Sequence, residues 1–274
     1  MTPPPKVLSI AGSDPSGGAG IQADLKTFSA LGAYGMCVVT ALTAQSTKGV
    51  TGVHPVPAGF VTEQLDTLLD DIAVDAVKIG MLADASVTAA VRACLEQLRA
   101  HESGTELPIV LDPVMVATSG DRLLADDAVA AVRDLVPLAG IITPNIPEAA
   151  VLLGCEPAGH VDEMLDQARR LVDAGARRVY LKGGHLDEGD RATDVYADAD
   201  TCVAGWSERV DTRNTHGTGC TLSSALAALR PQRPDWMTTV TDAKRWLTDA
   251  LHRADELQVG HGHGPVHHFH ATWS

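Results

Sequence analysis

The sequence has 274 residues, of which 45% are hydrophobic, and its formal net charge at pH 7 is −14. A chain of this length can bury a large core, and no low-complexity linker or internal repeat divides it, so we expect one domain over residues 1–274. The negative charge repels phosphate backbones, and no basic patch offsets it. We therefore expect a small-molecule ligand rather than a nucleic acid or an anionic membrane.

The sequence carries no sign of export or of metal-bound cysteines. No apolar stretch of about 18 residues predicts a membrane span, and the N-terminus lacks the charged-then-apolar order of a signal peptide. The 5 cysteines are an odd number without C-x-x-C spacing, which argues against a disulfide framework and against a structural zinc site. We expect a cytoplasmic protein with reduced cysteines.

Short apolar runs rich in β-branched residues alternate along the chain with helical patterns. The predicted strands are residues 7–11, 38–42, 76–79, 109–111, 141–143 and 179–181. Two apolar stripes with a period of 3.6 residues are Leu65, Leu68, Leu69 and Ile72, and Val161, Leu165, Ala168, Leu171 and Val172. Parallel strands need covered crossovers, so this alternation predicts an α/β fold with a mainly parallel central sheet and helices on both faces.

Two segments depart from that rhythm and are predicted to be small edge or flap strands. They are residues 51–56 and 194–206, where polar residues alternate with apolar ones. The last third of the chain predicts two helices, over residues 218–229 and roughly 236–257, because Pro231 and Pro234 interrupt the chain between them.

A glycine-rich segment, residues 12–20, connects the first strand to a helix marked by Ile21, Leu25 and Phe28. Such a loop can bring backbone N–H groups close to a ligand, and the alternative is an ordinary strand-to-helix turn. It matches neither the P-loop pattern nor the dinucleotide pattern G-x-G-x-x-G, which disfavours a Rossmann-type oxidoreductase. Asp24 could hydrogen-bond a ligand, or could simply place a favourable charge near the helix N-terminus.

A second glycine-containing segment, residues 214–220, precedes the helix predicted at 218–229. Gly217 and Gly219 bracket Thr218, so several backbone N–H groups can converge on one point at the positive end of the helix. We expect an anion hole there, with a capping turn as the alternative. We also expect the helix dipole and nearby cations to lower the pKa of Cys220 and make it the most reactive cysteine.

Polar residues follow three of the predicted strands. In doubly wound sheets ligands bind beyond the carboxyl ends of the strands, where Asp112, Asn145 and Glu148 should lie. These oxygen ligands suit Mg²⁺, although Asp112 could instead begin a turn and Glu148 could support a helix N-terminus. Lys182 ends the following strand and could hold a β- or γ-phosphate, with a solvated lysine as the alternative.

Six runs together match a known family over nearly the whole chain. They are IAGSDPSGGAGIQAD at residues 10–24, ALTAQ at 41–45, KIGML at 78–82, TPN at 143–145, KGGH at 182–185 and NTHGTGC at 214–220. With these runs the sequence resembles the hydroxymethylpyrimidine/phosphomethylpyrimidine kinases of thiamine biosynthesis, within the ribokinase-like superfamily. The resemblance implies a ribokinase-like fold, ATP and Mg²⁺ as cofactors, a homodimer, and phosphorylation of hydroxymethylpyrimidine and its monophosphate.

The resemblance also implies a role for each matching residue. The pyrimidine would be surrounded by Gly12, Asp24, Gln45, Met81 and Val114. Thr143, Asn145 and Lys182 would contact ATP, Asp112 and Glu148 would serve Mg²⁺, and Gly217, Thr218, Gly219 and Cys220 would form the anion hole that acts with Lys182 in catalysis. The amide of Gln45 can both donate to and accept from the edge of an aminopyrimidine.

The sequence departs from wider patterns at two positions. Many ribokinase-like enzymes have an aspartate base where this chain has Cys220, and some family members have lysine in place of Thr118. The His-rich tail, residues 260–270, is interpreted as native, with no assigned role. Two alternatives remain at this point: a pyridoxal kinase of the same branch, and a non-catalytic pyrimidine-binding protein.

Overall fold

A parallel sheet forms the centre of the computed structural model, which describes residues 3–100, 106–115, 128–184, 186 and 189–273. Within these residues an eight-stranded sheet has the order β10-β9-β8-β7-β6-β5-β1-β2. From β2 to β8 in this order, neighbouring strands pair in parallel. These strands are β1 (Lys6–Ala11), β2 (Tyr34–Val39), β5 (Ala76–Ile79), β6 (Ile109–Leu111), β7 (Ile141–Ile142) and β8 (Arg178–Lys182).

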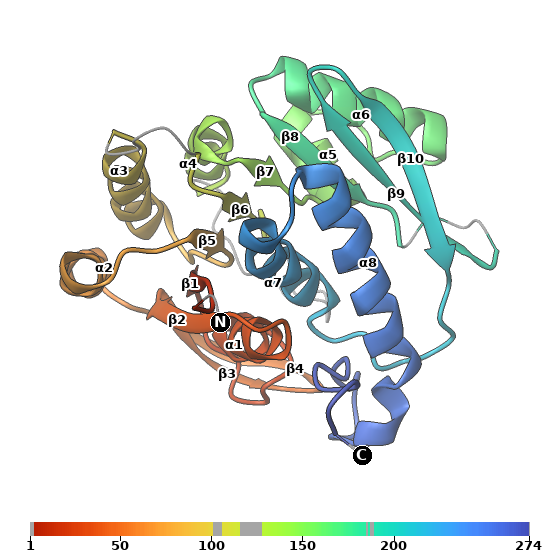
Figure 1. Cartoon of the computed structure of the whole chain (residues 1–274), viewed down its shortest axis with the longest axis horizontal. Helices are drawn as coiled ribbons and strands as arrows, with labels where there is room; N and C mark the ends of the chain where they lie inside the picture. Colours follow the sequence, from red (N-terminus) through yellow and green to blue (C-terminus); the bar gives the residue numbers. More distant parts are fainter. Residues whose placement is uncertain (1–2, 101–105, 116–127, 185, 187–188, 274) are drawn as a thin grey trace.

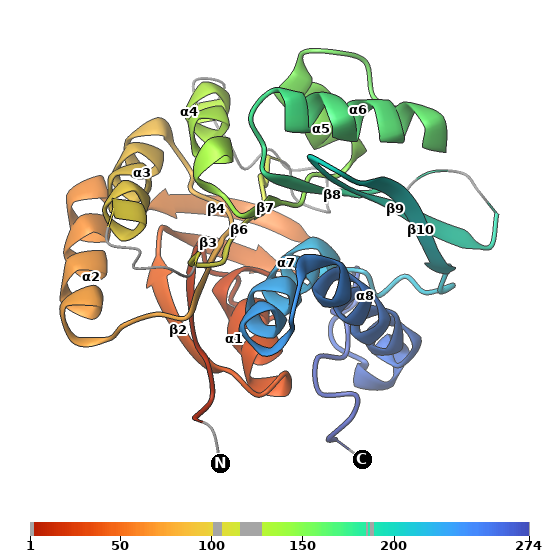
Figure 2. The same ribbon diagram turned by 45° about the horizontal axis from the view of Figure 1, so that its top comes forward.

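Helices cover both faces of this sheet (Figures 1 and 2). One face carries α2 (Ala58–Asp71), α3 (Ala85–Ala100), α4 (Ala128–Leu135), α5 (Ile146–Leu153) and α6 (Val161–Asp173). The other carries α1 (Gly20–Ala30), α7 (Thr218–Leu229) and α8 (Trp236–His252). Short 3₁₀ turns are η1 (Val136–Leu138), η2 (Arg230–Gln232) and η3 (Ala254–Leu257).

The strand sequences explain why both faces are covered. On β6, Ile109 and Leu111 join the core beneath α2 to α6, whereas Val110 between them joins the core beneath α1, α7 and α8. Successive side chains of a strand point to opposite faces, so an unbroken apolar run leaves no face for water. The predicted α/β fold with helices on both sides of a mainly parallel sheet is confirmed.

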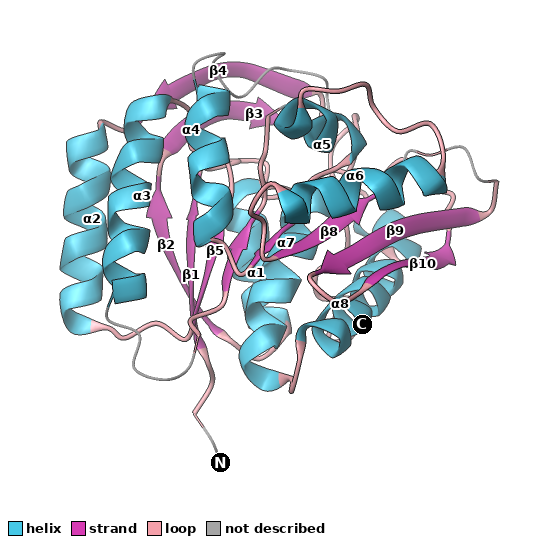
Figure 3. Cartoon of the chain, turned by 90° about the horizontal axis from the view of Figure 1, so that it is seen from above, coloured by secondary structure: helices cyan, strands magenta, loops and turns pink. Residues whose placement is uncertain are grey.

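The strand predicted at residues 38–42 is wrong, because the chain leaves the sheet in its middle. The β2 strand ends at Val39. The next residue, Thr40, donates a hydrogen bond from its N–H to the Ala11 carbonyl at 3.0 Å and one from its hydroxyl to the Met81 carbonyl at 2.6 Å. The chain then enters a separate antiparallel hairpin of β3 (Ala41–Ser46) and β4 (Gly49–Pro55). This hairpin, which we call the flap, lies beyond the C-terminal ends of β1 and β2 (Figure 3).

The prediction that residues 194–206 form edge or flap pieces is correct for only one of two strands. The edge of the sheet is β10 (Cys202–Glu208), but β9 (Arg191–Asp198) lies between β8 and β10 and is largely buried. Its inner residues pack on both sides, Val195 toward α6 and Tyr196 toward α8. The last predicted helix also ends early, since α8 stops at His252 and η3 follows. Among the described residues no helix is long and apolar enough to cross a membrane.

Candidate active site

A pocket lies where β1 ends, between the glycine-rich loop, the flap and the start of α7. Five predicted residues line it, namely Gly12, Gln45, Met81, Val114 and Cys220. No individual role was predicted from the sequence for the other lining residues. Four of them belong to the glycine-rich segment, namely Ser13, Asp14, Ala19 and Gly20, and the rest are Ala11, Thr43 and Lys78. We call this the acceptor pocket.

The acceptor pocket has one apolar wall and one polar wall. Met81, Ala41 and Ala83 form a small buried cluster against which Val114 packs. A Cβ atom at Gly12 would lie 2.6 Å from Cε of Met81, so glycine lets the end of the Met81 side chain lie against the loop backbone. On the flap, the hydroxyl of Thr43 donates to Oε1 of Gln45 at 3.1 Å. An apolar surface opposite an amide can hold a flat ring and hydrogen-bond its edge.

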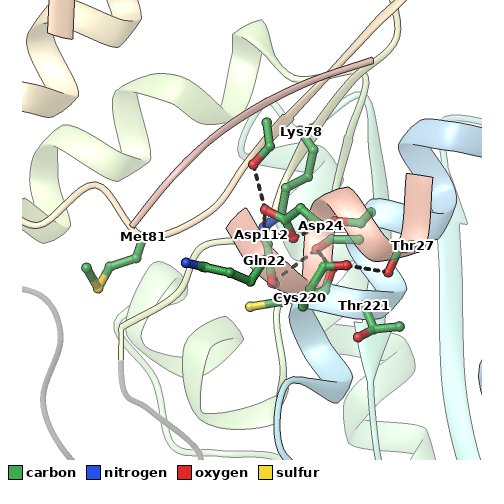
Figure 4. A network of polar contacts seen from close by, with 12 residues as sticks. Gln22, Asp24, Thr27, Lys78, Met81, Asp112, Cys220 and Thr221 are labelled. Atoms are coloured by element: carbon green, nitrogen blue, oxygen red, sulfur yellow. Dashed lines mark hydrogen bonds and ion pairs between the residues drawn. The ribbon is translucent and has the colours of Figure 1, made fainter. Parts of the chain in front are cut away.

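Asp24 lies beneath the acceptor pocket rather than in its lining. Its carboxylate is fully buried and accepts four hydrogen bonds: two from Nζ of Lys78, at 2.9 Å each, and one each from Ser9 and Ser224, at 2.6 Å. A carboxylate has about four acceptor sites, so all of them are occupied. Figure 4 shows Asp24 and Lys78 in this network. The predicted substrate role of Asp24 stays a prediction, whereas Lys78 reaches the lining.

The two glycine-containing loops are locked to each other. Nε2 of His216 lies 2.7 Å from Oδ2 of Asp14, and the Asp14 carboxylate also accepts from the N–H groups of Ser16 and Ala19. Gly217 has a φ of 76°, and a Cβ there would overlap the carbonyl of Gly18. Only glycine allows this contact and this backbone conformation together.

This loop contact places the N-terminus of α7 at the pocket. Gly217 precedes the first helical residue, Thr218. The first amides of a helix have no partner within the helix, so the N–H groups of Gly219 and Cys220 are available to a ligand. Together with the helix dipole they make a site suited to an anion.

The expectation that the Cys220 thiol is activated is wrong. Burial raises the pKa of Cys220 to about 11, and the nearby Lys78 ammonium does not offset it. The sequence predicted that the helix dipole and cations would lower this pKa. Although Cys220 lines the pocket, the loss of hydration around its thiol disfavours the thiolate more strongly. Near neutral pH this side chain is a neutral thiol.

A second polar cluster, the donor-side cluster, lies beyond the ends of β6, β7 and β8. Nζ of Lys182 is 2.8 Å from Oδ1 of Asp112 and 4.0 Å from Oε2 of Glu148. The hydroxyl of Thr143 donates to Asp112 at 3.0 Å. Asn145 caps α5, and its backbone and side chain exchange hydrogen bonds of 2.8 Å with Glu148 in a capping box. Residues predicted from three separate strand ends thus lie together.

The donor-side cluster contains more negative than positive charge when both carboxyl groups are ionised. Burial alone would raise the pKa of Asp112, but Lys182 and Lys78 hold it below its usual value. Burial raises the pKa of Glu148 to about 7, and the Asp112 charge adds to this despite Lys182. A buried pair of carboxylates with a single lysine between them fits a divalent cation, and Mg²⁺ commonly takes one or two protein carboxylates.

Gly219 connects the two halves of the site. A Cβ atom on it would lie 3.2 Å from Nζ of Lys182 and 3.7 Å from Oδ2 of Asp112, while the next residue, Cys220, lines the acceptor pocket. The N-terminus of α7, predicted to be an anion hole, therefore lies between the acceptor pocket and the donor-side cluster. A group bound in one can pass a phosphoryl group to the other across these backbone donors.

The His-rich tail ties the flap to the anion hole. The N–H of His263 donates to the Thr47 carbonyl in the flap turn at 2.9 Å, and the N–H of His216 donates to the Gly264 carbonyl at 3.0 Å. Nε2 of His268 lies 3.0 Å from the hydroxyl of Thr221 on α7. Among the described residues no group of three or more His, Cys, Asp or Glu could hold a metal ion. Thr118 lies outside the described residues.

Comparison with known proteins assigns the family. The phosphomethylpyrimidine kinase family model matches residues 14–267. The hydroxymethylpyrimidine/phosphomethylpyrimidine kinase of Escherichia coli (strain K12) is 52% identical over 267 residues, which cover 97% of this chain and 98% of that protein. The thiamine biosynthesis multifunctional protein ThiED of Corynebacterium efficiens is 51% identical over 98% of this chain and 36% of its own length.

A solved structure extends the comparison to three dimensions. The ADP complex of Bacillus subtilis pyridoxal kinase superposes with a TM-score of 0.87 and 34% identity, over 98% of this chain and 99% of that one. The identity to the pyrimidine kinase is higher, at 52%, so a pyridoxal kinase is the less favoured alternative. On the family match and this full-length identity, the chain belongs to the phosphomethylpyrimidine kinase family.

Proposed function

We propose that this kinase uses ATP to phosphorylate 4-amino-5-hydroxymethyl-2-methylpyrimidine and then its monophosphate, giving the diphosphate for thiamine biosynthesis. The observation that carries the proposal is the position of the Gly219 backbone between the acceptor pocket and the donor-side cluster. The 52% identity to a hydroxymethylpyrimidine/phosphomethylpyrimidine kinase supports the choice of substrate.

The acceptor is the pyrimidine, held in the acceptor pocket. Its ring packs against Met81 and Val114, and Gln45 hydrogen-bonds its polar edge. Gly12 has no side chain, so Met81 can lie close to the loop at the edge of the pocket. This arrangement directs the hydroxymethyl group toward the N-terminus of α7.

The donor is ATP, with its phosphates at the donor-side cluster. Lys182 contacts a phosphate oxygen, and Thr143 and Asn145 border the nucleotide site. Asp112 and Glu148 would hold Mg²⁺, which when bound neutralises phosphate charge during transfer. The N–H groups of Gly219 and Cys220 then bind the transferring group as its charge spreads over its oxygens.

The first transfer is an in-line displacement. The hydroxymethyl oxygen forms a bond to the γ-phosphorus, the bond from that phosphorus to the bridging oxygen breaks, and ADP leaves with the electron pair. The hydroxyl proton passes to water, because Cys220 is a protonated thiol near neutral pH and cannot accept it. A loose transition state requires little help from a base.

Mass spectrometry of the products tests this proposal. The protein is incubated with ATP, Mg²⁺ and hydroxymethylpyrimidine, and the reaction is sampled over time. We expect the monophosphate first and the diphosphate later. Absence of both products, with ATP unchanged, would refute the proposed substrate. The homodimer, the cytoplasmic location and the single domain over residues 1–274 stay predictions.

A further inference from the structure

The lining of the acceptor pocket contains a lysine with no assigned role. Lys78 lies on the central strand β5, and its side chain is fully buried, yet it borders the pocket. Asp14, the carboxylate in the same lining, is engaged by His216, Ser16 and Ala19. Lys78 therefore brings a cation to the pocket, and the carboxylate that neutralises it, Asp24, is not among the lining residues.

The ion pair between Lys78 and Asp24 has a direction. Lys78 borders the pocket, whereas Asp24 is not part of the pocket lining. The Asp24 carboxylate also accepts hydrogen bonds from the hydroxyls of Ser9 and Ser224. An ammonium has three N–H donors, and within the described residues Nζ of Lys78 donates hydrogen bonds to the two Asp24 carboxylate oxygens. Lys78 is thus the member of the pair that borders the pocket, and Asp24 uses two of its three ammonium donors.

A buried ion pair needs a reason beyond stability. Both side chains have 0% exposure, so each has lost its hydration, and an apolar pair of similar volume would often stabilise a core equally well. The position of this pair, under the pocket and beside Cys220 (Figure 4), places its charge where an acceptor group would lie. The pair is therefore suited to recognising an anion in the pocket.

The two transfers of the proposed reaction differ in acceptor charge. In the first, the acceptor is an uncharged alcohol. In the second, a non-bridging oxygen of the monophosphate attacks the γ-phosphorus of ATP, the bond to the bridging oxygen breaks, and ADP leaves with the electron pair. The monophosphate is mostly a dianion at neutral pH, so this step releases no proton, but it requires a dianion to enter the pocket.

We propose that Lys78, held by Asp24, is the residue that admits the monophosphate: its ammonium contacts the acceptor phosphate in the second transfer. This inference rests on the proposed function. Removing a hydrogen bond to a charged group weakens the interaction by roughly tenfold to a hundredfold. Loss of Lys78 should therefore reduce use of the monophosphate by that factor more than use of the alcohol.

The test compares kcat/KM for the two acceptors, measured separately, in the wild-type protein and in variants. The double variant Lys78→Met with Asp24→Asn removes both charges, so no unpaired charge is left in the core. Lys78→Gln, whose amide can still donate to Asp24, is the second variant should the first not fold. Ser224→Ala is the matched control, because it disturbs the same buried network and keeps the cation.

The expected result is a fall in the ratio of kcat/KM for monophosphate over alcohol, by roughly tenfold to a hundredfold in the double variant and in Lys78→Gln. The ratio in Ser224→Ala should stay within about twofold of wild type, since that change leaves the charge in place. An unchanged ratio in a folded Lys78 variant would overturn the inference and leave the α7 amides as the phosphate site. A wild-type protein that phosphorylates neither acceptor would instead refute the proposed function.

Discussion

Replacing Cys220 by serine or alanine separates the two roles that this residue can play. The thiol could remove the proton of the substrate alcohol, or the residue could act only through its backbone N–H at the start of α7. Both substitutions keep the N–H and remove the thiol. We expect each variant to keep kcat within about tenfold of wild type, because the anion hole survives.

The magnitude follows from the burial of the thiol. With a pKa of about 11, Cys220 is four units above pH 7, so about one molecule in ten thousand carries the thiolate. Forming the thiolate at pH 7 costs roughly 5 kcal/mol. A general base contributes about 10²- to 10⁴-fold, so the rarity of the thiolate cancels even the upper limit of that gain.

The assay is the pH–rate profile of kcat from pH 6 to about 9.5, which lies below the pKa of Cys220. Wild type and Cys220→Ser should share one profile. Gly219→Ala is the matched control in the same first turn of α7, because its new methyl group would lie 3.2 Å from Nζ of Lys182. It should lower kcat by roughly tenfold or more. A loss above about a hundredfold in Cys220→Ser, with both substrates still bound, would refute the backbone-only role.

Three further substitutions test other parts of the site. Gln45→Leu should weaken pyrimidine binding by about 1–3 kcal/mol, seen as a higher KM for the pyrimidine, and leave KM for ATP nearly unchanged, because polar atoms of the ring lose their hydrogen-bond partner. Equal effects on both KM values would place Gln45 outside the acceptor pocket. Lys182→Ala should weaken ATP use and phosphoryl transfer while pyrimidine binding, measured by calorimetry, is spared, and unchanged ATP kinetics would contradict its phosphate contact. Burial lowers the pKa of His268 to about 3, whereas an unfolded histidine titrates near 6.5, so the unfolded state takes up the proton first and the free energy of unfolding should fall by about 2 kcal/mol between pH 7 and pH 5. Chemical denaturation should show that His268→Gln weakens this pH dependence, and an undiminished fall would assign it to other groups.

The fold could be predicted because the strands are apolar on both faces, but two boundaries could not. Residues 38–42 are apolar except for Thr40, and threonine is common within strands, so nothing in the sequence marks Thr40 as the point where β2 ends. In β9, Asp194 suggested an exposed strand. Its carboxylate is instead buried, neutralised by Lys244 at 2.6 Å, and accepts a hydrogen bond from the hydroxyl of Tyr180 at 3.0 Å. From the sequence alone, a buried polar residue whose partners are distant in the chain cannot be told from a polar residue on the surface.

The site was predictable where topology alone brings residues together. Asp112, Asn145 and Lys182 follow neighbouring parallel strands, so their proximity follows from the sheet. Lys78 was missed because it lies inside an apolar strand, and its partner Asp24 is 54 residues away in the sequence. The thiol of Cys220 was misjudged because the sequence shows the helix start and the cations but does not show burial, which decides its pKa.

The most direct test of the proposed substrate is a comparison of ATP consumption with hydroxymethylpyrimidine, its monophosphate, pyridoxal and ribose, under one set of conditions. The acceptor pocket, lined by the amide of Gln45 and by the apolar side chains of Met81 and Val114, predicts the highest kcat/KM values for the two pyrimidines. Higher kcat/KM for pyridoxal or ribose would contradict the account.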